Sequence, residues 1–202
     1  MSSLRIVSWN VAGIRANLKK ECLQTFLKNT NFDIVCIQET KATEEQVTIP
    51  TEIAEKYPFR YWESTQGITQ RKGLSGTCIW TNKQPIQKLS SPEFDLEGRI
   101  TALEFENYIL VCVYTPNSQS SDSPRFSFRV NEWDNVFREY IKGLDHIKPT
   151  IICGDLNVAH LDIDIYNPSK LKQLGLKIED LRIVSAEPNN LDEFYDTEHF
   201  RI

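Results

Sequence analysis

The stretch TIICGDLNVAHLDID, residues 150 to 164, runs from apolar residues directly into a group of acidic and amide side chains. Its first residues have the branched apolar side chains typical of a buried β-strand, and Gly154 follows where such a strand meets a loop. Asp155 and Asn157 come next, two positions apart. The stretch therefore predicts a sheet-based fold in which a strand ends by presenting a carboxylate and a carboxamide.

Five more segments share this character, because each is a short β-type run that ends in polar residues. They are LRIVSWN (4–10), FDIVCIQE (32–39), GTCIWTN (76–82), RITALEF (99–105) and YILVCVYTPN (108–117). Helix-compatible segments lie between them at residues 18–29, 43–57 and 125–144. Short connections such as Glu106-Asn107 suggest hairpins. We predict an α/β protein with mixed or antiparallel sheets rather than a purely doubly wound fold.

Length and composition fit one intracellular globular domain. The chain has 202 residues, of which 40% are hydrophobic and 25% are charged. An odd number of cysteines without a CxxC pair favours a reducing compartment over a disulfide framework or a zinc site. No run approaches the ~20 apolar residues that span a bilayer. We expect a single domain over residues 1–202, no membrane contact, and a nuclear location if the source is eukaryotic.

Polar side chains follow four of the predicted strands, and their types select a hard metal ion. Asn10, Glu39, Tyr114, and Asp155 with Asn157 stand at these positions. Side chains at strand ends are held rigidly while the loops leave room for a substrate, so a shared site is expected. The carboxylates of Glu39 and Asp155 and the amide oxygens of Asn10 and Asn157 suit Mg²⁺, with Mn²⁺ as a substitute. Such a site points to phosphate chemistry.

Each of these residues also has a purely structural interpretation. Asn10 could simply end a strand, and Glu39 could form a surface ion pair with Lys41. Tyr114 could be a core ring with its hydroxyl at the surface, and Asp155 with Asn157 could form a turn after Gly154. The combination of the four strand ends is what favours a site.

Six motifs, in order along the chain, resemble those of the exonuclease III-like apurinic/apyrimidinic endonucleases, within the wider endonuclease/exonuclease/phosphatase superfamily. They are LRIVSWNVAGIRA (4–16), FDIVCIQETK (32–41), KGLSG (72–76), EGRI (97–100), VYTPNS (113–118) and GDLNVAHLDID (154–164). The resemblance covers about residues 4–168. It implies a four-layer α/β sandwich with two packed mixed β-sheets. It also implies Mg²⁺-dependent cleavage of double-stranded DNA on the 5′ side of abasic sites, in base excision repair.

The resemblance assigns roles to individual residues. Glu39 would be the principal metal ligand with Asn10 beside it, and Asp155 would orient or deprotonate the attacking water. Asn157 would position that water and the phosphate, and Tyr114 would donate a hydrogen bond to a phosphate oxygen. The DNA contacts would come from Arg15, Lys41, Lys72, Leu74 and Asn117.

Several DNA contacts also have a plain alternative. The net charge of −5 does not favour a partner held by the overall field of the protein. The basic residues near Arg15 and Lys72 could be solvated surface or a rim facing phosphates. Leu74 could be an apolar wedge beside an extruded sugar or part of an ordinary turn before the next strand.

The sequence departs from the family pattern at two places. Ala12 stands where some relatives carry an acidic or amide group, so one contact near the metal is absent. After Asn167 the strand pattern weakens, and the family's terminal motif with a catalytic His is not recognisable. We therefore expect residues 169–202 to be divergent or truncated and the sheets to be incomplete at the C-terminus.

Three functions are compatible with these motifs. The first is the abasic-site endonuclease, with 3′-exonuclease or 3′-phosphodiesterase activity as an open addition. The second is a phosphodiesterase of the same superfamily with another substrate. The third is a non-catalytic, truncated homologue that binds nucleic acid, which the missing terminal motif favours. The oligomeric state is not indicated by the sequence.

Overall fold

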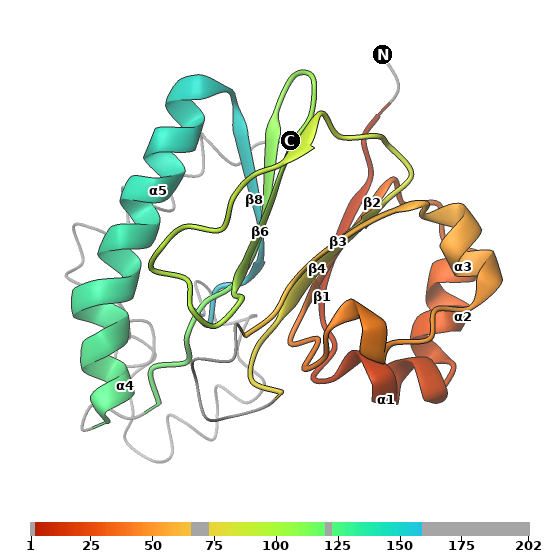
Figure 1. Cartoon of the computed structure of the whole chain (residues 1–202), viewed down its shortest axis with the longest axis horizontal. Coiled ribbons are helices and arrows are strands. Elements are labelled where there is room, and N and C mark those ends of the chain that lie inside the picture. Colours follow the sequence, from red (N-terminus) through yellow and green to blue (C-terminus); the bar gives the residue numbers. More distant parts are fainter. Residues whose placement is uncertain (1–2, 66–72, 120–122, 159–202) are drawn as a thin grey trace, which may run out of the picture. The chain divides into compact units, whose positions relative to one another are not determined.

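The computed structural model describes residues 3–65, 73–119 and 123–158 (Figure 1). The chain divides into two compact units. The first contains the residues up to Tyr114 together with Leu144–Asp155, and the second contains Thr115–Gly143 and the residues from Leu156 onward. The prediction of one domain over residues 1–202 stays a prediction, and residues 169–202 lie outside the described part.

Two mixed sheets of four strands each form the centre of the first unit. The first sheet has the order β1-β2-β4-β3, and the second sheet has the order β5-β6-β7-β8. The strands of the first sheet are β1 (Ile6–Asn10), β2 (Ile34–Gln38), β3 (Phe59–Glu63) and β4 (Thr77–Thr81). Those of the second sheet are β5 (Gln87–Lys88), β6 (Ile100–Glu104), β7 (Ile109–Tyr114) and β8 (Thr150–Asp155). The predicted α/β class with mixed sheets is confirmed.

All six strands predicted from the sequence are present, and the described residues contain two more strands that the sequence pattern did not predict. The turn between β6 and β7 is the expected hairpin at Glu106, and Phe105 and Tyr108 close it with a backbone hydrogen bond of 2.8 Å. The missed strand β3 lies at the edge of its sheet and is half-buried, so charged side chains interrupt its apolar pattern. The missed strand β5 has two residues, both exposed, and carries no hydrophobic signal.

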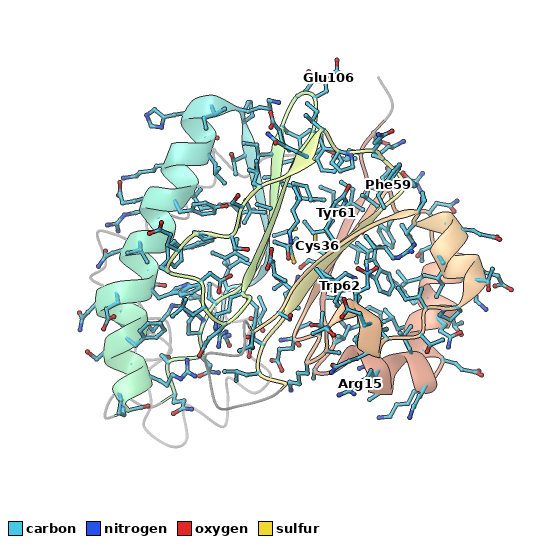
Figure 2. The ribbon with its side chains drawn as sticks, in the orientation of Figure 1. Arg15, Cys36, Phe59, Tyr61, Trp62 and Glu106 are labelled. Atoms are coloured by element: carbon cyan, nitrogen blue, oxygen red, sulfur yellow. The ribbon has the colours of Figure 1, made fainter. Side chains whose placement is uncertain are left out.

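Apolar side chains fill the space between the two sheets. The cluster includes Cys36 of β2 and Cys112 of β7, and Tyr61 of β3 packs against it. Figure 2 shows Cys36 and Tyr61 directed into the space between the sheets, whereas Trp62 lies on the other side of the first sheet. This alternation follows from the two-residue period of a strand. All five cysteines are free thiols.

Three helices cover the other face of the first sheet (Figure 1). The predicted helix over residues 18–29 is two helices, α1 (Ile14–Lys19) and α2 (Cys22–Asn29), because Glu21 adopts a left-handed conformation between them. The predicted helix over residues 43–57 is likewise divided into the 3₁₀ turn η1 (Glu44–Gln46) and α3 (Thr51–Lys56). Pro50 precedes α3 and lacks the N–H that a continuous helix requires.

The second unit begins with a long helical segment that the sequence predicts at residues 125–144. It consists of α4 (Pro124–Ser127), the π-helix η2 (Phe128–Trp133) and α5 (Asp134–Ile147), whose last turn belongs to the first unit. The Ser123 side chain caps its start by accepting a hydrogen bond from the Arg125 N–H, 3.1 Å away. Among the described residues, no helix has the length and apolar character needed to cross a bilayer.

Gly154 determines how closely β8 can approach β7. The two strands are parallel, and Gly154 stands opposite Val113 in their register. A Cβ atom at Gly154 would overlap the carbonyl oxygen of Val113 and lie 2.8 Å from its carbonyl carbon. Any side chain at this position would therefore push β8 away from β7, and Asp155 with it.

We expect Gly154→Ala to lower the free energy of unfolding by about 3 kcal/mol or more, because the added methyl group meets backbone that cannot yield. The measurement is urea denaturation followed by circular dichroism. Gly143→Ala is the matched control, since a Cβ at Gly143 in α5 has no atom within 4 Å. It should be neutral or stabilising by up to about 1 kcal/mol. Equal stability of the two variants would contradict the role of Gly154.

Candidate active site

Two pairs of parallel strands bring four predicted site residues to neighbouring strand ends. In the first sheet Asn10 of β1 stands opposite Gln38, the last residue of β2, and Glu39 follows directly. In the second sheet Tyr114 of β7 stands opposite Asp155 of β8. Because parallel strands end on the same side of a sheet, each pair presents its polar residues together. All four residues belong to the first unit.

The amide group of Asn10 joins the two carboxylates of the site. Its Nδ2 donates to Oε1 of Glu39 at 2.9 Å and to Oδ2 of Asp155 at 2.7 Å. Its Oδ1 accepts a hydrogen bond of 2.9 Å from the backbone N–H of Ala12. A backbone N–H can only donate, so it fixes which side of the amide carries the oxygen. One NH₂ group thus connects strand ends from both sheets.

Glu39 is held by its backbone as well as by its side chain. Its φ of 53° lies in the left-handed region that non-glycine residues rarely adopt. The following residues, Thr40 and Lys41, donate backbone hydrogen bonds of 3.0 and 2.9 Å to the carbonyls of Gly76 and Ser75. Gly76 is required here, since a Cβ at that position would overlap the Thr40 hydroxyl. The 73–76 loop therefore supports the unusual conformation of Glu39.

The Glu39 carboxylate is ionised in this environment. Burial raises its pKa, but hydrogen bonds from Asn10, Lys41 and Tyr114 outweigh burial and lower the pKa below its ordinary value. Lys41 lies 2.8 Å from Oε2 of Glu39. The ion pair considered from the sequence is therefore present, and it accompanies the contacts to Asn10 and Tyr114.

Tyr114 is a protonated hydrogen-bond donor at neutral pH. Burial, the hydrogen bond to Glu39 and the negative charges of Glu39 and Asp155 raise its pKa to about 12, although Arg99 opposes this shift. The hydroxyl donates to the Glu39 carboxylate. The side chain is thus neither a plain core ring nor a free surface hydroxyl.

The donor set fits a hard divalent cation. Two carboxylates are held by one amide, and oxygen is the ligand type that Mg²⁺ prefers. Within residues 3–65, 73–119 and 123–158, no group of three or more His, Cys, Asp or Glu side chains could hold a metal ion. Mg²⁺ does not need such a group, because it keeps several waters and binds through one or two carboxylates plus substrate phosphate.

Asn117 and Asn157 are paired within the second unit. Nδ2 of Asn117 donates to Oδ1 of Asn157 at 3.3 Å, and Nδ2 of Asn157 donates to the carbonyl of Thr115 at 2.8 Å. The buried Arg129 of η2 supports both loops, since its guanidinium donates to the carbonyls of Pro116 and Leu156 at 2.6 and 2.9 Å. Asn157, like Glu39, has a left-handed backbone.

The remaining predicted DNA contacts are spread over other elements. Arg15 is exposed on α1, where Figure 2 labels it. Leu74 is half-buried in the 73–76 loop, and its carbonyl accepts a 2.8 Å hydrogen bond from the Thr65 hydroxyl. Lys72 lies outside the described residues.

Arg99 contacts a predicted site residue, although its position in the sequence does not indicate this. The Cζ atom of Arg99 lies 4.8 Å from the centroid of the Tyr114 ring. In the sequence, Arg99 stands out only as a member of the EGRI motif (97–100). An arginine in a sequence is expected at the surface, and only the fold shows that this one is buried.

Comparisons with known proteins find relatives in sequence and in fold. The chain is 40% identical over 168 residues to an exodeoxyribonuclease from Bacillus subtilis, a match that covers 82% of this chain and 63% of the relative. It is 38% identical over 170 residues to the DNA repair nuclease APEX1 of Danio rerio, covering 83% of this chain and 53% of the relative. The chain therefore spans between half and two thirds of the length of these two proteins.

Solved structures show the same fold. An AP endonuclease from Archaeoglobus fulgidus superposes with a TM-score of 0.72 at 23% identity, covering 95% of this chain and 71% of that one. A 3′ phosphatase from Neisseria bound to a product DNA hairpin gives a TM-score of 0.71 at 20% identity, covering 98% and 70%. The Endonuclease/Exonuclease/phosphatase family model matches residues 7–200. The chain belongs to the Endonuclease/Exonuclease/phosphatase family.

Proposed function

We propose that this chain carries the site of a DNA repair nuclease that cleaves the backbone of double-stranded DNA on the 5′ side of abasic sites with the aid of Mg²⁺. The observation that carries the proposal is the pair of carboxylates, Glu39 and Asp155, held 2.9 and 2.7 Å from the same Asn10 nitrogen. Relatives named as exodeoxyribonuclease and DNA repair nuclease support the choice of DNA. The location would be intracellular and reducing, as the five free cysteines and the DNA repair relatives support, and nuclear in a eukaryote.

Glu39 is the residue best placed to hold Mg²⁺, or Mn²⁺ in its place. Its lowered pKa keeps it charged, and Asp155 offers a second carboxylate. The bound ion would supply positive charge to the phosphate oxygens as negative charge builds on them. Lys41 pairs with Glu39 in the structure, so the ion and the lysine compete for one carboxylate. A lysine displaced from Glu39 would be available to the DNA backbone.

Asp155 and Tyr114 would act on the water and the phosphate. Asp155 would orient or deprotonate the attacking water, since its carboxylate lies 2.7 Å from the same Asn10 amide nitrogen that holds Glu39. Tyr114 would transfer its hydrogen bond from Glu39 to a phosphate oxygen, where it stabilises developing charge. Asn117 and Asn157 would contact the phosphate, and Arg15, Lys72 and Leu74 would contact the rest of the DNA.

The geometry favours a positioning role for Asn10 over the metal-ligand role that the sequence predicted. Its oxygen accepts from Ala12, and its nitrogen faces the carboxylates. The NH₂ group would keep two like charges close together without neutralising either of them.

Removal of either carboxylate charge is expected to abolish Mg²⁺-dependent nicking. Glu39→Gln and Asp155→Asn preserve side-chain shape, and each should lower kcat/KM on a duplex with one abasic site by at least about 100-fold. Glu104→Gln is the matched control, because Glu104 and Glu39 are both 18% exposed and each pairs with a lysine. It should stay within about twofold of the parent chain. The measurement is single-turnover nicking with Mg²⁺ and with EDTA.

Other outcomes of this assay would change the proposal. Nicking that survives in EDTA would contradict the metal requirement. A folded parent chain that binds the duplex without nicking would favour the non-catalytic homologue. Release of phosphate from a 3′-phosphate duplex, with no nicking at the abasic site, would favour a related phosphatase with another substrate.

Asn10→Asp separates the two roles considered for Asn10. An aspartate keeps an oxygen ligand but replaces the bridging NH₂ with a third negative charge, so we expect nicking to fall by about 100-fold or more. The measurement is the rate of nicking across an Mg²⁺ titration. Asn10→Asp with undiminished activity and tighter Mg²⁺ dependence would instead establish Asn10 as an oxygen ligand.

Tyr114→Phe is expected to lower kcat by about 100-fold, with little change in KM, because it removes one hydrogen bond to the developing charge. The pKa of about 12 keeps the phenol protonated throughout the assay range. The ratio of parent to variant kcat should therefore be constant from about pH 6 to about pH 9. A ratio that falls as the pH rises through this interval would show that the phenol ionises during the assay.

A further inference from the structure

Arg99 directly precedes β6, at the end of a loop that is held by several hydrogen bonds. The buried carboxylate of Asp95 accepts hydrogen bonds of 2.8 Å from the N–H groups of Arg99 and Ile100. The Arg99 side chain is 4% exposed, and its Nε donates to Oε2 of Glu97 at 2.6 Å. A guanidinium that is buried to this extent cannot contact DNA, so its charge serves neighbouring protein groups.

Three contacts connect Arg99 to Tyr114. The Tyr114 N–H donates to the carbonyl of Arg99 at 2.8 Å, and Nη1 of Arg99 donates to the carbonyl of Tyr114 at 3.0 Å. The guanidinium also lies over the Tyr114 ring, 4.8 Å from its centroid. The first two contacts fix the backbone on both sides of the Tyr114 Cα, and the third fixes the face of the ring.

The opposite end of the Tyr114 side chain meets Glu39. A tyrosine side chain turns about two main torsions, so fixing the backbone and one ring face leaves the hydroxyl few positions. In the observed position the hydroxyl donates to the Glu39 carboxylate. Arg99 thus contacts the backbone and ring of Tyr114, while the hydroxyl at the other end of the side chain lies in the site.

We infer that Arg99 is a positioning residue that holds the Tyr114 hydroxyl at the Glu39 carboxylate and thereby sets the rate of the proposed reaction. The inference rests on the proposed function for its effect on rate, whereas the hold on Tyr114 is independent of it. Arg99 contributes shape as well as charge. Its planar fork donates to Glu97 and to the Tyr114 carbonyl while one face covers the ring, and a lysine ammonium cannot do all three.

Kinetics of Arg99→Lys alone and in the Tyr114→Phe background test the effect on rate. Arg99→Lys should lower kcat for nicking about 10-fold with KM within about twofold, because the misplaced hydroxyl weakens only the transition state. With Tyr114→Phe already present, the same change should lower kcat by less than about twofold, since no hydroxyl remains to be positioned. An equal loss in both backgrounds would overturn the inference.

Fluorine NMR of the chain labelled with 3-fluorotyrosine tests the hold on Tyr114 without any activity. Of the seven tyrosine signals, the one lost in Tyr114→Phe belongs to Tyr114. Arg99→Lys should shift or broaden that signal. The matched control is Arg60→Lys, whose arginine also donates to backbone carbonyls, those of Ala54 and Tyr57. It should leave the Tyr114 signal in place.

The NMR measurement also covers a variant that does not fold and a parent chain without activity. If Arg99→Lys does not fold, Glu97→Gln replaces it, because this change weakens the anchor at Nε while Arg99 remains; it should displace the Tyr114 signal in the same direction. A Tyr114 signal unaffected by a folded variant would overturn the inference. A parent chain that nicks no DNA but shows the expected signal change would refute the proposed function and leave the hold of Arg99 on Tyr114 established.

Discussion

The bridge formed by the Asn10 amide is the interaction on which the site depends. Its two hydrogen bonds, of 2.9 and 2.7 Å, connect a carboxylate after β2 in one sheet with a carboxylate at the end of β8 in the other. Two carboxylates repel each other when they are brought together, and the repulsion raises the pKa of at least one unless donors compensate it. The structure supplies those donors at Glu39 from three directions, and the pKa of Glu39 is lowered despite its burial.

The backbone accepts unfavourable conformations to place these donors and acceptors. Glu39, Lys41 and Ser75 all have φ values near 50°, in the left-handed region. Such residues cost about 1 to 3 kcal/mol each and persist where the surroundings determine them. Here the surroundings that hold these conformations include the 73–76 loop, which accepts backbone hydrogen bonds from Thr40 and Lys41. The unfavourable φ values and the hydrogen bonds that hold them thus occur together after β2, where Glu39 lies.

Two buried arginines hold predicted site residues, one in each unit. Arg99 holds Tyr114 in the first unit, and Arg129 holds the loops of Asn117 and Asn157 in the second. Both arginines donate to backbone carbonyls and each is paired with one acidic side chain, Glu97 or Asp134. A buried charge without partners would be costly, so these pairs define one conformation for the loops they contact. Neither role can be predicted from the sequence, because the residue type alone does not tell whether an arginine is buried or exposed.

The sequence by itself determined the six apolar strands and the polar residues at their ends, because strand periodicity and turn residues are local properties. It also determined the family motifs. The tertiary structure alone decided that Asn10 turns its nitrogen, and not its oxygen, toward the carboxylates, since the N–H of Ala12 claims the oxygen. It alone decided that Glu21 adopts a left-handed conformation between α1 and α2, and that β3 and β5 lie at edges of the two described sheets. The two carboxylates that Asn10 contacts lie 29 and 145 positions away along the chain, and the edge strands pair with separate segments, so no local pattern records these contacts.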